Sequence, residues 1–398
     1  MRLKCYCLKK IKESRGDILK RKIAVIFGTR PEAIKLAPVV KKLSESKILE
    51  PVVILTGQHR EMLDQVLKTF DIQADYNLNV MVEKQTLSIL TSKIVSGLDG
   101  IFKKISPSFT IVQGDTTTTF IASLVSFYHK IPVGHVEAGL RSFDIYNPFP
   151  EEANRRLTSV ISTLHFAPTD KARNNLLKEG VKSSKIVVTG NTVVDSLMWI
   201  VKNKSSILDE KLWTFLKDYE ISDKKLILLT MHRRENWGIK MKSAFLGVKD
   251  VLKERRDILV VFPVHLNPIV RETAFSIFHG LDNVLLVDPV DYITMIALIK
   301  NSYAILTDSG GIQEEAPTFG KPVLILRDTT ERPEIIEAGC GKLIGTDRQK
   351  VRVNFENILE DQDLYLSMSK AKNPFGDGKA AERIIEFVEN FLTKGDNE

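Results

Sequence analysis

The sequence predicts an α/β protein made of two doubly wound parallel sheets. Short apolar runs rich in β-branched residues recur along the chain, and stretches of helical composition separate them. Strands that alternate with helices form parallel sheets, because each crossover helix returns the chain to the same end of the sheet. The length of 398 residues exceeds what one hydrophobic core usually supports, which favours two domains.

The predicted strands fall into two sets. The first set comprises residues 23–27, 52–56, 110–112, 132–136, 165–167 and 186–189. The second set comprises residues 226–230, 258–262, 284–287, 304–307 and 323–326. An amphipathic last helix is predicted from apolar residues at helical spacing, namely Ala381, Ile384, Ile385, Val388, Phe391 and Leu392.

Between the two sets, at about residues 191–224, helical and charged residues replace strands. We therefore predict a basic extension over residues 1–21, an N-terminal domain of residues 22–190 with 376–398, and a C-terminal domain of residues 191–375. The last helix would cross back to the first domain. Ligands of such folds bind at the carboxyl ends of the strands, so a cleft between two facing sheets is expected.

The formal charge of +7 does not indicate a nucleic-acid or membrane partner, because the excess lies in one tail. Nine of the 57 basic residues and two of the 50 acidic residues lie within residues 1–22, so the remainder is balanced. No apolar run approaches the roughly 18 residues that span a bilayer. We expect neither nucleic-acid binding nor membrane insertion.

The basic extension lacks the apolar stretch and the cleavage site of a secretory signal, which favours a cytoplasmic protein. Cys5 and Cys7 lie in it and Cys340 is far away in sequence, so no disulfide framework is expected. A disordered, solvated tail explains these residues, and an over-called start codon is the alternative.

Two segments each contain a carboxylate residue after a predicted strand. Asp115 lies in the segment Gln-Gly-Asp-Thr-Thr-Thr-Thr at 113–119, and Glu137 lies in His-Val-Glu-Ala-Gly-Leu-Arg at 135–141. The carboxyl ends of parallel strands meet at one edge of a sheet, so these carboxylates are expected to gather there. Clustered carboxylates are typical of acid and base catalysis.

Structural roles remain alternatives for several of these residues. Asp115 could be a turn or helix-cap residue before the helix that starts at the threonines. Glu151 lies at a Pro-Glu-Glu helix start, where acids are favoured in any case. His135 and Arg141 flank Glu137 and could serve only to orient it.

The first predicted strand runs into a turn that suits an anion. Gly28 permits a tight turn, Pro31 suits a first helical position, and Arg30 and Lys35 add positive charge near the helix N-terminus. The three spaced glycines of a dinucleotide site are absent, which disfavours a nicotinamide cofactor.

A second anion site is predicted in residues 307–316, which follow a strand. Ser309, Gly310 and Gly311 can expose backbone N–H groups at a helix start, which suits a diphosphate. Glu315, one turn further, could reach sugar hydroxyls or could merely complement the helix dipole.

Charged residues follow two further strands of the second set. Arg327 could bind a phosphate or could pair with Glu331 or Glu334, and the sequence does not choose between them. His232 ends the first strand of this set. A histidine in that place is a core or helix-capping residue about half the time and a functional residue otherwise.

Together these segments resemble the non-hydrolysing UDP-N-acetylglucosamine 2-epimerases, which have the GT-B architecture of two Rossmann-like domains. The resemblance covers about residues 22–395. It rests on the motifs at 28–35, 58–65, 114–119, 132–141, 150–155, 190–195, 232–235, 307–317 and 328–334.

The resemblance implies reversible epimerisation at C2 of UDP-N-acetylglucosamine, by elimination of UDP to a 2-acetamidoglucal and re-addition, in service of surface polysaccharide synthesis. It implies no redox cofactor and no metal, and a homodimer. The implied catalytic residues are Asp115, Glu137, Glu151 and His232. The implied diphosphate contacts are Arg30, Lys35, Ser309, Gly310, Gly311 and Arg332, with Glu315 on the ribose.

Two regions depart from the family pattern. Val290 and Met295 stand near the expected uracil site, where many relatives carry an aromatic residue. Relatives also bind a second UDP-N-acetylglucosamine as an activator. The matching residues are Gln58, His59 and Gln85, with Lys84 in place of a common arginine.

Three other functions remain open at this point. A hydrolysing epimerase would release N-acetylmannosamine and UDP, and a GT-B glycosyltransferase would transfer the sugar to an acceptor. A non-catalytic sugar-nucleotide sensor would bind without turnover, although no catalytic candidate is missing from the sequence.

Overall fold

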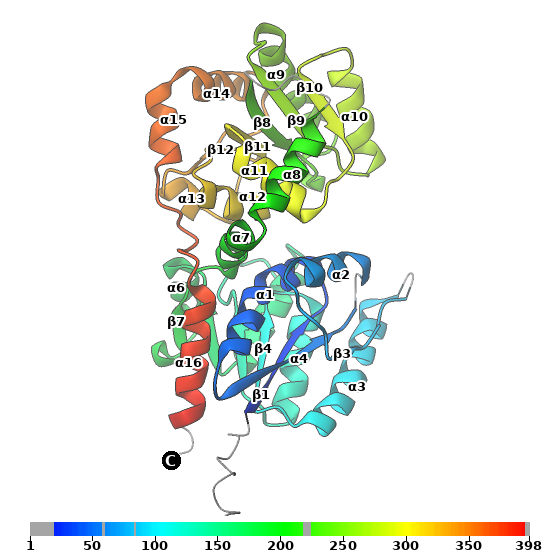
Figure 1. Ribbon diagram of the computed structural model, residues 1–398, viewed down its shortest axis with the longest axis vertical. Helices are drawn as coiled ribbons and strands as arrows, with labels where there is room; N and C mark the ends of the chain where they lie inside the picture. Colours follow the sequence, from blue (N-terminus) through cyan, green and yellow to red (C-terminus); the bar gives the residue numbers. More distant parts are fainter. Residues whose placement is uncertain (1–19, 58–59, 83–84, 218–223, 395–398) are drawn as a thin grey trace, which may run out of the picture. The chain divides into compact units, whose positions relative to one another are not determined.

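The computed structural model describes residues 20–57, 60–82, 85–217 and 224–394 (Figure 1). The predicted basic extension lies almost entirely outside these residues, as do Cys5 and Cys7.

The first sheet has seven strands in the order β3-β2-β1-β4-β5-β6-β7 (Figure 1). Its strands are β1 (Arg21–Phe27), β2 (Leu49–Leu55), β3 (Tyr76–Asn77), β4 (Phe109–Gln113), β5 (Val133–Val136), β6 (Leu164–Ala167) and β7 (Ile186–Val188). The helical segments in this part of the chain are α1 (Arg30–Glu45), α2 (Arg60–Thr69), α3 (Leu87–Ile105), α4 (Thr117–Tyr128), α5 (Glu151–Ile161), α6 (Asp170–Lys178), η1 (Ser183–Lys185), α7 (Thr192–Asn203) and α8 (Ser205–Leu216).

The second sheet has six strands in the order β10-β9-β8-β11-β12-β13, and every neighbouring pair is parallel. Its strands are β8 (Lys225–Thr230), β9 (Ile258–Pro263), β10 (Val284–Val287), β11 (Ala304–Thr307), β12 (Val323–Ile325) and β13 (Gly341–Leu343). The helical segments are η2 (Arg234–Asn236), α9 (Ile239–Glu254), α10 (Pro268–Phe278), α11 (Tyr292–Asn301), α12 (Gly310–Glu315), η3 (Ala316–Phe319), α13 (Glu334–Glu337), α14 (Arg348–Glu360), α15 (Gln362–Ser369) and α16 (Ala380–Lys394).

The predicted fold class is confirmed, and all eleven predicted strands are present. The prediction missed β3 and β13 for a physical reason. Strand β3 has only two residues, and β13 has three, one of them a glycine, so neither shows a periodic pattern.

The strand order reverses once in each sheet. Strand β1 lies between β2 and β4, and β8 lies between β9 and β11. Loops that follow the strands at such a point diverge and leave room for a ligand. The residues that follow β1, β4, β8 and β11 include Arg30, Asp115, His232 and Ser309, all of them predicted site residues.

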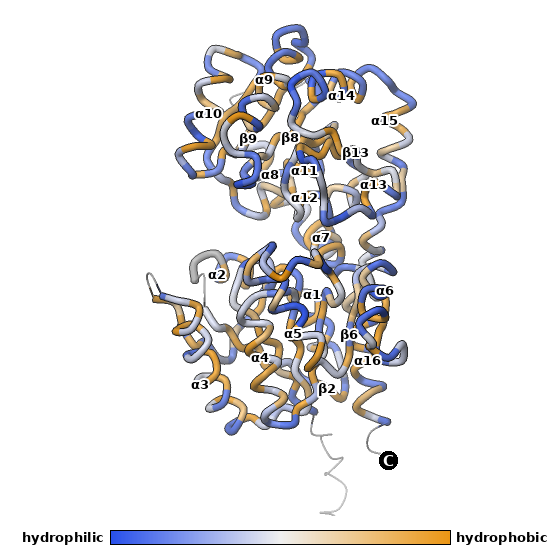
Figure 2. Tube along the Cα trace, turned by 180° about the vertical axis from the view of Figure 1, so that it is seen from behind, coloured by the Kyte–Doolittle hydropathy of each residue, from blue (hydrophilic) through white to orange (hydrophobic). Residues whose placement is uncertain are grey.

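The central strands are buried because helices cover their sheets. In β1 the residues Ile23 to Ile26 have no exposed surface, and in β8 the same holds for Ile227 to Leu229. Apolar residues run along such strands, whereas polar residues dominate the connections (Figure 2). Continuous apolar runs of this kind are typical of parallel sheets.

Internal contacts divide the chain into two units. Unit 1 is Met1–Val136, Ala153–His165 and Glu382–Glu398, and unit 2 is Glu137–Glu152 and Phe166–Ala381. The predicted domain boundaries at 190/191 and 375/376 stay a prediction.

The predicted amphipathic last helix is confirmed as α16. Ile384 and Val388 have no exposed surface, and the rings of Phe391 and Phe109 meet at 5.9 Å in an edge contact. Arg21 Nη1 donates to the Leu392 carbonyl at 2.8 Å. The apolar face of α16 thereby completes the core of unit 1.

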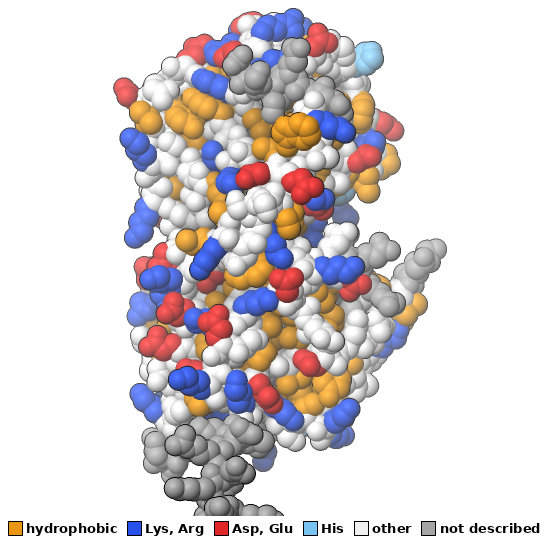
Figure 3. Space-filling view, in the orientation of Figure 1, with side chains coloured by type: hydrophobic (Ala, Val, Ile, Leu, Met, Phe, Trp, Pro, Cys, Tyr) orange, Lys and Arg blue, Asp and Glu red, His pale blue; other side chains and the backbone are white. Residues whose placement is uncertain are grey.

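Within the described ranges, no helix combines the length and the apolar character that crossing a membrane would need. On the face in Figure 3, Lys and Arg side chains are interspersed with Asp and Glu side chains. This mixture agrees with the balanced charge of the sequence after residue 22.

Candidate active site

Glu137 follows β5 and has an unusual backbone conformation. Its φ of 64° lies in the left-handed region, and its side chain is buried. Asn191 Nδ2 donates to Glu137 Oε1 at 3.2 Å, while Asn191 Oδ1 accepts the N–H of Val193 and caps α7. A non-glycine residue held in this region costs energy and is typical of functional sites.

Arg332 is the central cation of unit 2. Its Nε donates to Glu314 Oε1 at 2.6 Å and its Nη1 to Glu331 Oε1 at 2.8 Å, with 15% of the side chain exposed. Burial acts to lower the pKa of Arg332, but the charges of Glu314, Glu331 and Glu137 outweigh burial and raise it. Glu137 and Arg332 are therefore electrostatically coupled.

Glu331 is surrounded by three arginines. Burial acts to raise its pKa, but the charges of Arg332, Arg327 and Arg233 outweigh burial and lower the pKa of Glu331 to about 2. Arg233 Nη2 donates to Glu331 Oε1 at 3.1 Å. Glu331 thus stays ionised and holds the arginines together.

The structure settles the partner of Arg327 that the sequence left open. Arg327 Nη1 pairs with Glu331 and its Nε lies 2.9 Å from Glu235 Oε1. Glu334 instead accepts a hydrogen bond from Thr169 Oγ1 at 2.9 Å. Arg327 therefore has a structural role in the arrangement around Glu331.

The two glycines at the start of α12 have different surroundings. A Cβ on Gly310 would lie 2.6 Å from Arg332 Nη1, whereas a Cβ on Gly311 would meet only Ser309 Oγ, at 3.9 Å. Ser309 is the N-cap residue, but its side chain makes no capping hydrogen bond. Because Gly310 has no side chain, the guanidinium of Arg332 can pack against this loop. The surface at Gly311 is open.

His232 is positioned by a buried carboxylate. Asp308 has no exposed surface and accepts the backbone N–H groups of His232 at 3.1 Å and Arg233 at 2.9 Å. Asn236 Nδ2 also donates to Asp308, at 3.0 Å. Burial, helped by Arg233 and His265 and opposed by Asp308, lowers the pKa of His232. The imidazole is accordingly neutral near pH 7.

Glu315 lies at the other end of α12 and has a partner that the sequence analysis missed. Tyr292, the first residue of α11, donates its hydroxyl to Glu315 Oε1 at 3.2 Å. Val290 precedes this helix and Met295 lies within it, both half-buried. Tyr292 lies two positions after Val290, and whether Val290 and Met295 contact a uracil stays a prediction.

Asp115 follows β4 in unit 1 and forms an ion pair with Arg155 of α5. Asn154 Nδ2 donates to the Asp115 carbonyl at 3.0 Å. The N-cap of α4 is Thr116, whose Oγ1 accepts the N–H of Thr119 at 3.1 Å. Asp115 therefore does not cap this helix, but it does lie in the turn that precedes it, which is the other structural role expected from the sequence.

The residues that flank Glu137 in sequence have partners elsewhere. His135 is fully buried and its Nε2 lies 2.7 Å from the Gly114 carbonyl. Arg141 forms a bidentate pair with Glu179, with both distances at 2.7 Å. His135 thus supports the backbone just before Asp115.

Glu32, which the sequence analysis passed over, organises the loops after β1 and β4. Its carboxylate accepts the N–H groups of Gly28 and Thr29, and the hydroxyls of Thr29, Thr116 and Thr119, at 2.7 to 3.2 Å. Burial raises the pKa of Glu32 although these hydrogen bonds oppose it. The Thr-x-x-Glu capping-box pattern was the available sequence signal.

Three predicted residues lie at helix starts. Arg30 and Lys35 are half-buried in the first two turns of α1. Glu151 is the first residue of α5, and its Oε2 is buried without a hydrogen-bond partner among the described residues. A buried carboxylate oxygen left in this way is a candidate for a ligand contact.

Of the predicted activator residues, only Gln85 belongs to the described residues; Gln58, His59 and Lys84 lie outside them. Gln85 Nε2 lies 3.4 Å from Met81 Sδ. In the part of the chain that the structure describes, no three His, Cys, Asp or Glu side chains are grouped as a metal site requires.

The sequence model of the UDP-N-acetylglucosamine 2-epimerase family matches residues 41–389. The chain belongs to this family. The UDP-N-acetylglucosamine 2-epimerase of Bacillus subtilis is 50% identical over 369 residues, which cover 92% of this chain and 94% of that protein. The enzyme of the same name from Escherichia coli K12 is 48% identical over 371 residues, with 93% and 98% covered.

Solved structures agree with this assignment to the 2-epimerase family. The Neisseria meningitidis epimerase bound to UDP-GlcNAc has a TM-score of 0.85 and 47% identity, covering 93% of this chain and 100% of its own. The Methanocaldococcus jannaschii epimerase with UDP-GlcNAc and UDP has a TM-score of 0.76 and 35% identity, covering 93% and 99%. The predicted family, two-domain fold and epimerase class are confirmed.

Proposed function

We propose that this epimerase interconverts UDP-N-acetylglucosamine and UDP-N-acetylmannosamine without releasing the free sugar. The observation that carries the proposal is the coupling of Glu137 to Arg332. Glu137 is a buried carboxylate whose charge acts on the half-buried guanidinium of Arg332, and this pairing of charges suits proton transfer next to a departing diphosphate.

The chemistry explains why both charges are needed. No carbonyl acidifies the hydrogen on C2 of the sugar. Cleavage of the bond from C1 to the UDP oxygen gives C1 oxocarbenium character and so acidifies that hydrogen. A base then takes the C2 proton, leaving a 2-acetamidoglucal and UDP. In the return step the bond to UDP re-forms at C1 while a proton is delivered to the opposite face of C2, so no net redox change occurs.

We assign the departing diphosphate to Arg332 and to the backbone of Ser309 to Gly311, whereas diphosphate binding by Arg30 and Lys35 stays a prediction from the sequence. The open space at Gly311 and the fixed guanidinium of Arg332 support this assignment. A neutral His232 would donate a hydrogen bond to the leaving oxygen, in keeping with its lowered pKa.

The nucleoside would lie at the other end of α12. Glu315 is held by Tyr292, and its carboxylate suits the two ribose hydroxyls. Val290 and Met295, near the start of the same helix α11, would contact the uracil.

Asp115, Glu137 and Glu151 are the candidates for the base and the acid. Their surroundings differ: Arg155 pairs with Asp115, the Asn191 amide donates to Glu137, and Glu151 has a buried oxygen without a described partner. Different surroundings let carboxylates hold different protonation states, as opposite-face transfer requires.

Surface polysaccharide synthesis is the proposed destination of the product. We also propose a homodimer and activation by a second UDP-N-acetylglucosamine. Exposed apolar side chains on α4 and α5 would favour association, namely Phe127, Tyr128, Leu157 and Val160. The cytoplasmic location stays a prediction.

Proton NMR of the purified protein with UDP-N-acetylglucosamine in deuterated water tests the proposal. We expect UDP-N-acetylmannosamine to accumulate to equilibrium with deuterium at C2. Free N-acetylmannosamine with UDP would establish the hydrolysing reaction instead. An unchanged spectrum would contradict the proposed epimerisation.

Glu137→Gln should retain UDP binding and lose about 10²- to 10⁴-fold in turnover, because an amide cannot exchange the C2 proton. Turnover by the same NMR assay and UDP affinity by calorimetry measure the two effects. Glu210→Gln, at an exposed position of α8, is the matched control. Turnover of Glu137→Gln at the control's rate would exclude Glu137 from the mechanism.

A further inference from the structure

A cavity of about 420 Å³ lies at the edge of the second sheet where its strands begin. Its lining residues come from α8, the starts of β8 and β9, the end of α11, the segments before β11 and β12, and α15. They are Leu212, Leu216, Lys224, Lys225, Leu226, Leu259, Asn301, Ser302, Tyr303, Lys321 and Tyr365. Three lysines and no acidic side chain are among these described residues.

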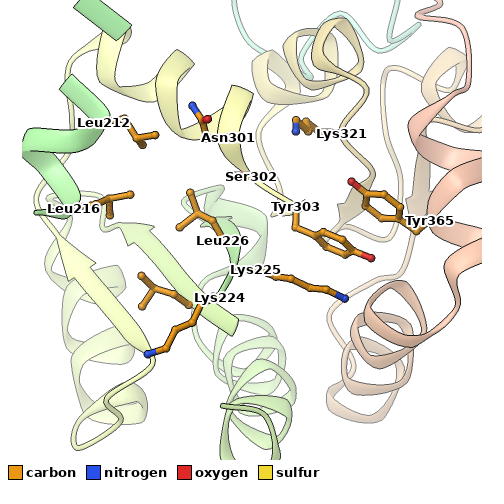
Figure 4. Close-up of a pocket in the computed structure, with 11 residues that line it drawn as sticks. Leu212, Leu216, Lys224, Lys225, Leu226, Asn301, Ser302, Tyr303, Lys321 and Tyr365 are labelled. Atoms are coloured by element: carbon orange, nitrogen blue, oxygen red, sulfur yellow. The ribbon is translucent and has the colours of Figure 1, made fainter. Parts of the chain in front are cut away.

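The cavity has an apolar side and an aromatic, cationic side. Figure 4 shows Leu212, Leu216 and Leu226 on one side and Tyr303 with Tyr365 on the other. The two tyrosine rings stack with their centres 4.1 Å apart and an angle of 13° between their planes. A flat, partly apolar molecule suits such walls.

Two of the lysines differ in how their charge is satisfied. Lys225 Nζ lies 4.3 Å from the centre of the Tyr303 ring and donates to the Leu359 carbonyl at 3.0 Å. Lys321 is half-buried, and burial lowers its pKa. No acidic side chain of the described residues forms an ion pair with its ammonium group, so Lys321 has a desolvation cost and no compensating charge.

This cavity is separate from the candidate active site. Lys225 begins β8 and His232 follows the end of the same six-residue strand, so about 20 Å of extended chain separates them. Lys321 likewise precedes β12, whereas Arg327 and Arg332 follow it.

We propose that this cavity binds an organic phosphate, with the phosphate at Lys321 and a flat or apolar body between the tyrosine pair and the leucines. Lys321 supplies a compact positive charge for the phosphate. No carboxylate lines the cavity among the described residues, so none competes with the ligand for this ammonium group.

Calorimetry with phenyl phosphate tests the proposal, using the full chain saturated with UDP so that UDP sites do not compete. We expect saturable binding that is at least about tenfold tighter than that of phenol or inorganic phosphate. Phenol lacks the phosphate group that would bind Lys321, and inorganic phosphate lacks the aromatic ring that would contact the tyrosines and leucines. Lack of saturation at millimolar phenyl phosphate, or equal affinity for phenol, would overturn the proposal.

Lys321→Gln should weaken phenyl phosphate about tenfold or more, whereas Lys342→Gln, at an exposed lysine of β13, should not change it. Tyr303→Leu should weaken phenyl phosphate and leave inorganic phosphate unaffected. Equal binding by Lys321→Gln and the unmodified chain would refute the role of this cavity.

Thermal unfolding provides a second readout for Lys321. Without ligand, Lys321→Met should raise the unfolding temperature, because it removes a half-buried charge that lacks an ion pair. Phenyl phosphate should then raise the unfolding temperature of the unmodified chain and not that of the variant. An equal rise in both proteins would argue against the site.

Discussion

Gly310 and Gly311 are neighbours in one loop, yet a methyl group at each would have opposite effects. At Gly310 it would displace the Arg332 guanidinium from Glu314 and Glu331, since the space is already filled. At Gly311 it would enter open space on the surface of a helix.

We therefore expect Gly310→Ala to destabilise the protein by about 1–3 kcal/mol and to weaken UDP binding. Gly311→Ala should leave stability unchanged or raise it by up to about 1 kcal/mol, because alanine favours a helix. Thermal unfolding and calorimetry with UDP measure both effects. If Gly310→Ala has the unfolding temperature and the UDP affinity of the unmodified protein, a methyl group at this position does not displace Arg332.

At the residue scale, the sequence did not predict the partners that hold the candidate site residues in place. Asp308 holds His232 in place through hydrogen bonds between loops 75 or 76 residues apart. Glu32, likewise, joins loops that are 84 and 87 residues apart. No local periodicity encodes such contacts, because they depend on which strands become neighbours.

At the scale of elements, Asp195 links α7 to the start of α16. Asp195 is buried, and its Oδ1 accepts the N–H of Ala381 at 2.8 Å. Burial raises the pKa of Asp195 to about 6, although the N–H groups of Ala381 and Ala380 oppose the rise. The native state therefore holds a proton that the unfolded chain releases nearer pH 3.8.

The free energy of unfolding contributed by Asp195 should consequently fall as pH rises from about 4 to about 6. Asp195→Asn stays neutral, so its stability relative to the unmodified protein should increase across this window by up to about 3 kcal/mol. Urea unfolding at pH 4, 5, 6 and 7 measures the difference.

Asp209→Asn, an exposed carboxylate on α8, is the control and should show no such trend. Parallel pH profiles for Asp195→Asn and the unmodified protein would mean that Asp195 ionises in the native state as it does in the unfolded chain.

Strands were predictable where their residues form an apolar run. The alternation of apolar runs and helices marked eleven strands, including the three-residue β7 and β12, and the spacing of apolar residues marked α16. Strands β3 and β13 are held by neighbouring strands through a few backbone pairs, and their side chains carry no pattern.

At the scale of the whole molecule, the chain closes its first unit with its last helix. Ile384 is fully buried in α16, so Ile384→Ala should lower the free energy of unfolding by about 2–5 kcal/mol. Exposed Glu386→Ala on the same helix should change it by less than about 0.5 kcal/mol.

Amide hydrogen exchange would show which part of the molecule loses stability in Ile384→Ala. We expect Ile384→Ala to reduce amide protection in β1 and β4 of unit 1 more than in β8 and β11 of unit 2. A loss confined to β8 and β11 would show that α16 supports the other unit.

The contact between Phe109 and Phe391 also sets an order of events during synthesis. At about 5–20 residues per second, a ribosome adds the second ring roughly 15–55 s after the first. Throughout that interval the nascent first unit exposes apolar surface that only the end of the chain can cover. Ribosome-associated chaperones therefore have a defined surface to shield here, and a ribosome that stalls before α16 would leave that surface exposed.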